Sequence, residues 1–498
     1  MNKLLLSILI ALLVFITNMV RAQTITGRVL EKGELPISYA TVQITEKYGV
    51  LTNEEGRFLL EAKKFKPTDT ITISYLGYKS IKLALKDFKS KDYYLIEDIN
   101  TLSEIKISNK KLSIEEILEK VKENVSKNYA TANIKQQIFH RSTNKVKFKR
   151  FEFEFTKSNL LNKQELKKLN ASIDSLITTV VNVPSTNYDD VLSELYTLQD
   201  TSVLKMIKAT RLINKKNDKS EKIFQELFLN TVAKHLDTNE TYKVKSGLFK
   251  VEDSLKVKMD FDTSYRDSIP VKFMKNNYNE IITNNSISKE SKLDFIFKTK
   301  KYKYELKGTS MLDNELIYVI GFSPKRKSAK FEGIFYVNAY DFAVVKTDFK
   351  YAKNRSGKGV NLRFLLGVKF KENLKNISVL YKKNENGLYS LQFIKQEKGV
   401  YVYAHRPFKF TKNRKSRAED KKMMKIDFLM EMNQVGKEEL FFISEKQLTK
   451  SEFDKIKQKK KCKVTYISKY NAAIWKGYNV INPIEEIKNY DTGEVVNE

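Results

Sequence analysis

The feature that most constrains the fold is a series of short segments in which apolar and polar side chains alternate. Apolar side chains occupy every second position in residues 40–44, and the same period recurs in residues 71–75 and 81–85. Period two is the repeat of a β-strand, because successive side chains point to opposite faces. Each segment therefore predicts a strand with one face in an apolar core and the other in water.

Turn-forming residues separate these segments. We assign structural turns to four glycines, because glycine tolerates the positive φ that tight turns need: Gly27, Gly49, Gly56 and Gly77. The intervening segments predict about seven short strands, namely TITGRVL, YATVQIT, GRFLLE, TITISYL, SIKLALK, DYYLIE and EIKIS. Such a density of short strands is typical of a β-sandwich.

Residues 24–108 resemble the carboxypeptidase-regulatory-like domain of envelope proteins from Bacteroidetes. The resemblance is carried by a series of short motifs: GRV at 27–29, PI at 36–37 before ATV at 40–42, GRF at 56–58, YLGY at 75–78 and, last, LSEIKI at 102–107. The resemblance implies a transthyretin-like or Ig-like β-sandwich over residues 23–108. It also implies a domain without catalytic residues, since the family resembles an accessory module of carboxypeptidases.

The chain begins with a segment typical of a secretory signal. Lys3 precedes an apolar run over residues 4–16, and Val20 and Ala22 occupy the −3 and −1 positions of a cleavage site. We expect residues 1–22 to be a cleaved signal peptide, because the run falls short of the roughly 20 residues that span a membrane. We therefore predict an exported protein of the periplasm or outer membrane, without a transmembrane helix after cleavage.

The composition is strongly basic. The 498 residues include 91 Lys and Arg against 60 Asp and Glu, a formal net charge of +31. Export argues against nucleic acid as the partner, and the lysines are spread along almost every segment. Two interpretations stay open: a solvated surface, or attraction to an anionic lipid or glycan surface of the envelope. A single cysteine, Cys462, excludes an internal disulfide framework.

A helix is predicted over residues 112–128. Ser113 and Glu116 have the spacing of a capping box, and apolar residues then recur at helical intervals. The helix, followed by Asn128-Tyr129 and Phe139-His140-Arg141, resembles the region after the regulatory-like domain in other large envelope proteins of Bacteroidetes. That resemblance implies no activity.

An aromatic strand follows this helix. Phe151, Phe153 and Phe155 alternate with Glu152 and Glu154, so the three rings share one face. One interpretation makes these rings the lining of an apolar pocket. The alternative is that they belong to an ordinary packed core.

The rest of the chain predicts an α+β domain over residues 109–498. Residues 157–240 read as a helical insertion, and residues 241–450 as long antiparallel strands, with a hairpin turn at Asn386-Gly387. Such strands in succession favour a curved, half-barrel-like sheet. The rhythm of residues 331–345 is similar to that of periplasmic half-barrels that carry lipoproteins or lipids. The overall fold class is therefore mainly β.

The sequence offers few candidates for catalysis. The three histidines, His140, His235 and His405, do not occur in an HExxH motif, and there is no GxSxG elbow or Walker A loop. We therefore predict no catalytic residue, no metal ligand and no cofactor.

Three functions remain open from the sequence. The first is a non-catalytic binding or scaffold protein of the cell envelope, with an envelope protein or an anionic surface as its partner. The second is a periplasmic carrier of an apolar or lipid ligand in the C-terminal half-barrel. The third is an unrecognised hydrolase built from dispersed residues. The sequence does not predict the oligomeric state.

Overall fold

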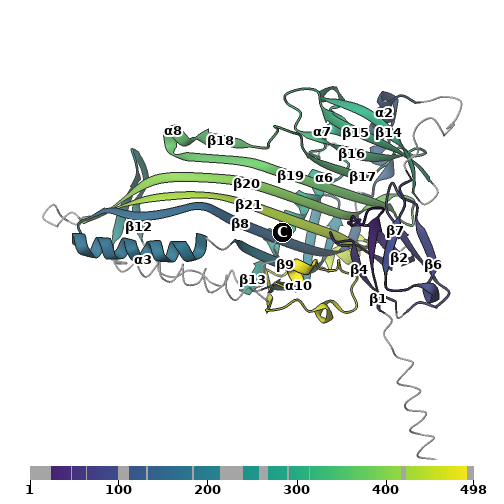
Figure 1. Ribbon diagram of the computed structural model, residues 1–498, viewed down its shortest axis with the longest axis horizontal. Helices are drawn as coiled ribbons and strands as arrows, with labels where there is room; N and C mark the ends of the chain where they lie inside the picture. The colour runs from purple at the N-terminus through teal and green to yellow at the C-terminus, as the bar shows by residue number, and fades with distance from the viewer. Residues whose placement is uncertain are drawn as a thin grey trace, which may run out of the picture. The chain divides into compact units, whose positions relative to one another are not determined.

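The computed structural model describes residues 24–490 except for 46–47, 63, 99–111, 131–132, 182–183, 213–238, 257–266, 289–290, 313–314, 415 and 417–421. The chain forms two compact units. The first contains residues 1–106, 308–317 and 471–488, and the second contains residues 107–307, 318–470 and 489–498. Each unit is described by itself, and Figure 1 shows the elements of both.

The N-terminal strands form two sheets, as the alternation predicts. One has the order β4-β1-β7, with β1 (Thr24–Glu31), β4 (Arg57–Glu61) and β7 (Asp92–Leu95). The other has the order β3-β2-β5-β6, with β2 (Thr41–Thr45), β3 (Tyr48–Leu51), β5 (Thr70–Ser74) and β6 (Ile81–Ala84). The predicted sandwich is confirmed. The expected strand EIKIS lies outside the described residues.

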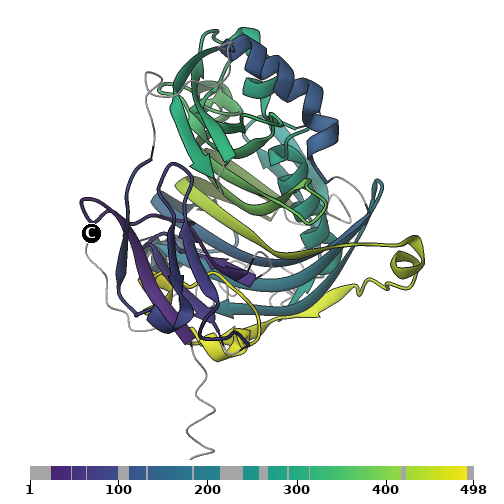
Figure 2. The same ribbon diagram turned by 90° about the vertical axis from the view of Figure 1, so that its right-hand side faces the viewer.

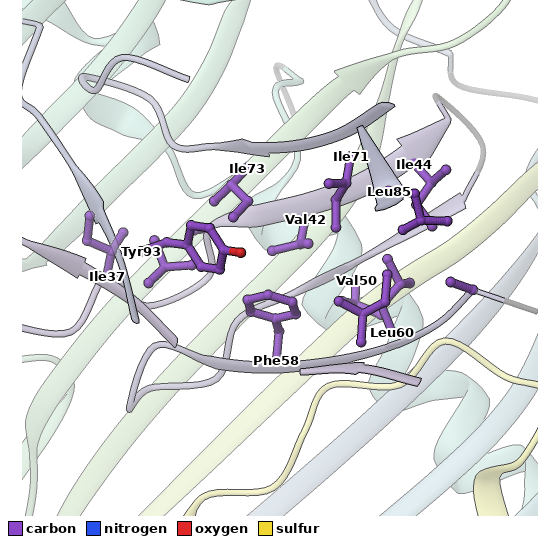
Figure 3. Packing of buried hydrophobic residues seen from close by; sticks show 14 of the residues in the cluster. Ile37, Val42, Ile44, Val50, Phe58, Leu60, Ile71, Ile73, Leu85 and Tyr93 are labelled. Carbon is purple, nitrogen blue, oxygen red and sulfur yellow. The ribbon is translucent and has the colours of Figure 1, made fainter. Parts of the chain in front are cut away.

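The apolar residues of the two sheets face one another in a closed core. Val42, Phe58 and Ile73 are each at most 1% exposed. Phe58 of one sheet points toward Val42 of the other, and Tyr93 lies beside them (Figure 3). The buried positions in β2 and β5 alternate with less buried ones, so the period of the sequence is the period of burial.

The four glycines assigned to turns have two different roles. Gly56 and Gly77 occupy turns with φ of +74° and +93°. Gly27 and Gly49 lie inside β1 and β3 instead of in turns. A Cβ atom on Gly27 would lie 2.9 Å from the ring of Phe58, and one on Gly49 would lie 2.7 Å from the carbonyl oxygen of Val42. Close packing therefore explains these two glycines.

A segment near the C-terminus completes the first unit. The side-chain amide of Asn53 donates to the carbonyl oxygen of Pro483 at 3.1 Å. The backbone N–H of Glu485 donates to the carboxylate of Glu55 at 2.9 Å. The loop between β3 and β4 is thus bound by residues about 430 positions later in the chain.

The second unit begins with the predicted helix, α2 (Ile114–Asn128). The Ser113 side chain accepts a hydrogen bond from the N–H of Glu116, and the Glu116 carboxylate accepts one from the N–H of Ser113. The capping box is confirmed. At the other end, the Tyr129 hydroxyl donates to the carbonyl oxygen of Val344 and accepts from its N–H.

One large, curved sheet dominates the second unit (Figure 2). Its three longest strands lie side by side in the order β20-β21-β8 (Figure 1). β8 (Ile134–Ser158) and β21 (Met423–Gln447) each have 25 residues, and β20 (Tyr389–Lys412) has 24. The curved antiparallel sheet predicted from the C-terminal half is confirmed.

The shorter strands extend this sheet. On one side lie β14 (Tyr302–Leu312), β15 (Glu315–Pro324), β16 (Phe331–Asn338), β17 (Val344–Tyr351) and β19 (Val368–Lys383), with β18 (Gly359–Leu362) paired to β19. On the other lie β9 (Ser185–Leu198), β10 (Thr201–Leu212) and β23 (Thr465–Ile467), while β11 (Thr241–Ser246) and β12 (Phe249–Lys256) form a hairpin on β20. The turn between β19 and β20 contains Asn386-Gly387, as predicted.

The remaining described α-helices and strands are short, apart from two helices. They are α3 (Lys163–Val181), β13 (Ser268–Pro270), α6 (Val271–Asn285), α7 (Asp294–Phe297), α8 (Arg363–Leu366), α9 (Lys450–Asp454), β22 (Lys461–Lys463) and α10 (Glu485–Lys488). None of the helices in the described residues is long and apolar enough to cross a membrane.

The predicted helical insertion over residues 157–240 is wrong for residues 185–212. α3 is a helix, but β9 and β10 follow it as strands of the large sheet. Val191 and Leu192 are both buried, as are Leu195 and Tyr196. Pairs of adjacent apolar residues that recur after four positions resemble one face of a helix. A strand that is buried on both faces gives the same pattern. Residues 213–238 lie outside the described part.

Candidate functional site

Helices α3 and α6 cover the same face of the large sheet. β20 and β21 pair without a shift in register from Phe393–Phe441 to Thr411–Met423, so residues of equal parity share a face. On β21, Phe428 packs against the apolar cluster beneath α3. Glu438 lies on the same face and contacts His140, whose ring packs against Tyr278 of α6. We call this surface the helix face.

The α3 end of the helix face is closed. Phe153 and Phe155 are 7% and 1% exposed, and they pack against Ile173 and Ile177 of α3. Asn170 of α3 also bonds the backbone of Phe155, accepting from its N–H at 2.9 Å and donating to its carbonyl oxygen at 3.1 Å. These two phenylalanines are therefore core residues and do not line a pocket.

The α6 end of the helix face is also closed. Tyr278 is fully buried and lies 3.4 Å from the hydroxyl of Ser193 on β9. Asn285 donates from its side chain to Gln396 of β20 at 3.2 Å. Burial raises the pKa of the Tyr278 hydroxyl well above its usual range, so this hydroxyl stays neutral. The polar groups under α6 thus serve to fix the helix on the sheet.

Between the two closed ends the helix face is mainly apolar and half-buried, with Gln434 and Glu372 as polar neighbours of Val400. We call these residues the open section: Val368 and Phe370 of β19, Val400, Val402 and Ala404 of β20, Met430 and Met432 of β21, and Val146, Phe148 and Phe151 of β8. All ten are half-buried except Phe370, which is 38% exposed. Of the three phenylalanines proposed as pocket lining, only Phe151 belongs here, and it packs edge-on against Phe148 and Phe428.

On β8, the opposite face of the sheet is charged. Lys147, Lys149, Arg150, Glu152 and Glu154 of β8 all point to it and are exposed. A sheet in water is expected to keep its apolar face covered and its polar face solvated. Here the polar face follows that rule, whereas the apolar face remains partly accessible.

Two lysines lie at the α6 end of the open section. Lys375 of β19 is paired directly with Lys398 of β20, so both side chains project from the helix face. Burial, followed by the charges of Lys398 and Lys292, lowers the pKa of Lys375 to about 8. The carboxylate of Glu372 opposes this shift. Like charges placed directly across a ladder destabilise the sheet, and an anion between them would relieve the repulsion.

The histidines do not form a catalytic group in the described part of the chain. His140 is 2% exposed and contacts Glu438, while Ser142 donates to the other oxygen of the same carboxylate at 3.1 Å. The serine therefore faces the carboxylate and not the imidazole that would have to activate it. His405 pairs with Asp427 at 3.0 Å. His235 lies outside the described residues.

Metal-ligating side chains are dispersed over the described residues. Within them, no group of three or more His, Cys, Asp or Glu side chains is arranged to hold a metal ion. Cys462 is half-buried, and burial raises the pKa of its thiol. A raised pKa keeps the sulfur protonated and weakly nucleophilic.

Comparison with known families concerns the first unit. Residues 25–107 match the family model of the CarboxypepD_reg-like domain. The N-terminal sandwich is a carboxypeptidase-regulatory-like domain. This family supports a non-catalytic role for the sandwich. It leaves the large sheet unassigned, because the match ends before α2.

Comparison of the whole chain gives only distant similarity. No curated protein sequence matches it. A LolA superfamily protein from Nitrosomonas europaea is 9% identical, with 64% of this chain and 92% of that chain covered and a TM-score of 0.18. A domain named for outer membrane lipoprotein sorting, from Vibrio parahaemolyticus, is 10% identical, with 68% and 96% covered and a TM-score of 0.19. At such TM-scores the similarity carries no information on function.

Proposed function

We propose that this chain is a non-catalytic envelope protein that binds a lipid, or another ligand with a long apolar chain, along the open section of its large sheet. The observation that carries the proposal is the half-buried apolar strip between α3 and α6. The exported location is part of the proposal and rests on the signal-like residues 1–22. In this proposal the N-terminal regulatory-like sandwich has no catalytic role.

The dimensions and chemistry of the strip suit an alkyl chain. From Val400 to Ala404 the strand rises by about 14 Å at the usual rise per residue. Met430 and Met432 contribute flexible side chains that adapt to ligands of variable shape. Covering apolar surface contributes about 25 cal/mol per Å², so a chain lying on this strip gains affinity without a directional contact.

The lysine pair defines the polar end of the ligand. Lys375 and Lys398 lie on the helix face beside the open section, which places cationic groups next to apolar ones. A ligand with an anionic group at one end of an alkyl chain satisfies both surfaces. Binding of the anion would raise the lowered pKa of Lys375 again, because an opposite charge favours the ammonium form.

We attribute no enzymatic activity to the chain. In the described residues, His140 is enclosed between Glu438 and Tyr278, and His405 is paired with Asp427. Neither arrangement presents a base to a nucleophile. Hydrolysis of an ester or peptide by the purified protein, lost on a point substitution, would contradict this part of the proposal.

Native mass spectrometry of the mature protein from its own cell envelope tests the binding function. We expect a mass greater than that of the chain by the mass of a retained lipid. A bare chain mass, together with no binding of a fluorescent fatty acid in solution, would contradict lipid binding and leave a scaffold role.

Two matched substitutions locate the ligand. Met432→Glu places a carboxylate in the open section, and Val435→Glu places one on the opposite face of the same strand, where the residue is also half-buried. We expect the first to abolish binding of the fluorescent fatty acid and the second to retain it. Equal binding by both variants would remove the ligand from the helix face.

A further inference from the structure

Two neighbouring turns of the second unit expose large apolar side chains. Leu248, in the turn between β11 and β12, is 99% exposed, and Phe249 beside it is 53% exposed. Phe364 and Leu365 of α8 are fully and 78% exposed. We call these four residues the apolar tip. Scattered exposed apolar residues are ordinary, whereas a cluster of this kind marks an interaction surface.

Arg406 of β20 holds the two turns together. Its guanidinium donates to the carbonyl oxygen of Leu366 at 2.7 Å, and to the carbonyl oxygen and hydroxyl of Ser246, both at 2.9 Å. It also lies over the ring of Phe249, 5.7 Å from its centroid. The hairpin and α8 therefore form one structure, and both lie at the left-hand end of the long strands in Figure 1.

Backbone contacts to β20 fix each turn. Gly367 ends α8 with φ of +65°, and its carbonyl oxygen accepts from the N–H of His405 at 2.8 Å. A Cβ atom on Gly367 would lie 2.1 Å from the carbonyl oxygen of His405. Gly247, with φ of +57°, donates to Pro407 at 3.3 Å. The backbone of both turns is thus fixed, and the exposure of their side chains does not come from a loose chain end.

Basic residues surround the apolar tip. Lys245 and Lys250 flank the hairpin turn, and Arg363 begins α8; all three are exposed. Lys245 is also paired with Lys409 of β20. The acidic residues Glu252 and Asp253 follow further along β12, where Asp253 is an ion-pair partner of Lys250 and Lys243.

We propose that the apolar tip is a membrane contact that inserts into the interface of an anionic bilayer. Projecting side chains can enter a fluid lipid phase without a complementary pocket. A protein partner would need such a pocket to receive them. The flanking cations fit anionic headgroups, each contributing about fivefold in affinity near such a surface. This contact goes beyond ligand binding in the open section, because none of the four tip residues belongs to that section.

Vesicle flotation with the full mature chain tests the contact. We expect binding to phosphatidylcholine vesicles that contain phosphatidylglycerol, weaker binding to pure phosphatidylcholine, and weaker binding at high salt. The double variant Leu248→Glu/Phe364→Glu should lower the partition coefficient at least about tenfold. Phe273→Glu is the control for an added carboxylate, because Phe273 of α6 is 69% exposed but lies outside the tip; it should bind as the natural chain does.

A fluorescent label reports insertion independently of these charge changes. Replacing the single cysteine by Cys462→Ser allows a polarity-sensitive dye to be attached at Leu248→Cys. We expect the emission to shift to the blue on addition of the anionic vesicles. Unchanged emission, or vesicle binding by the double variant equal to that of the control, would overturn the proposal. The proposal would also be overturned if neither the natural chain nor the double variant bound vesicles, and if the natural chain self-associated whereas the double variant did not.

Discussion

The N-terminal sandwich and the large sheet share the same alternation of apolar and polar residues, but they bury the apolar residues to different extents. In the sandwich, apolar residues such as Val42 and Ile73 meet those of a second sheet and are completely buried. In the large sheet, the residues of the open section also alternate, apart from a bulge in β8, but all except the exposed Phe370 stay half-buried between α3 and α6. Alternation therefore identifies the apolar face of a strand, and only tertiary structure decides whether that face is covered.

The largest expected effect belongs to the closed core of the sandwich. Phe58→Ala removes a side chain that is 1% exposed and packs over Gly27. We expect the free energy of unfolding to fall by about 3–5 kcal/mol, because a cavity is left. Urea denaturation followed by circular dichroism measures this loss. A change below about 1 kcal/mol would mean that the sandwich is not closed as described.

A turn of the same sandwich should give the next largest effect. Gly56→Ala places a Cβ atom 2.3 Å from the carbonyl oxygen of Val29, at a φ of +74°. We expect a loss of about 1–3 kcal/mol, from steric conflict and backbone strain together. Gly33→Ala is the control for φ alone, since Gly33 has a φ of +109° and nothing within 4 Å of an added Cβ. Equal losses of unfolding free energy in the two variants would show that the close approach at Gly56 does not cause the destabilisation.

The third prediction concerns pH and the lysine pair of the large sheet. The folded-state pKa of Lys375 is lowered to about 8 from 10.5, so the unfolded chain binds more protons between these values. Stability then rises with pH through this window. Lys375→Met should be more stable than the natural chain at pH 7, with the difference closing toward pH 10.5. The difference should be modest, because solvent screens a half-buried charge; denaturant titrations at both pH values measure it.

The smallest effect on stability belongs to the open section. Met432→Ala truncates a side chain that is already half-buried, so we expect less than about 1 kcal/mol of destabilisation. Affinity for the fluorescent fatty acid should nevertheless fall, because apolar contact area is lost. If the variant lost as much stability as Phe58→Ala, the section would be a closed core like that of the sandwich.

Local signals made part of this fold predictable from the sequence. The capping box of Ser113 and Glu116, the Asn386-Gly387 turn and the alternation of the sandwich strands each depend on a few adjacent residues. β9 was not predictable in this way, because burial on both faces removed the alternation that identifies a strand. Gly27 was likewise mistaken for a turn, since its contact with Phe58 joins distant segments.

The candidate site was less predictable than the fold. Phe151, Phe153 and Phe155 are equivalent in the sequence, but α3 buries the last two and leaves the first half-buried. The lysine pair, Lys375 and Lys398, depends on the register between β19 and β20, with a shift between Glu372 and Leu374. The apolar tip depends on Arg406, which joins turns more than 100 residues apart in sequence.

The bond between Asn53 and Pro483 has a consequence for the synthesis of the protein. Its two residues are separated by 430 positions, so the first unit cannot be completed until residues 471–488 have been synthesised. Until residues 471–488 arrive, the Asn53 amide and the backbone partners of this segment must be solvated by water. A chain that ends before residue 471 therefore lacks part of its first unit, although the missing residues lie far from that unit's strands in the sequence.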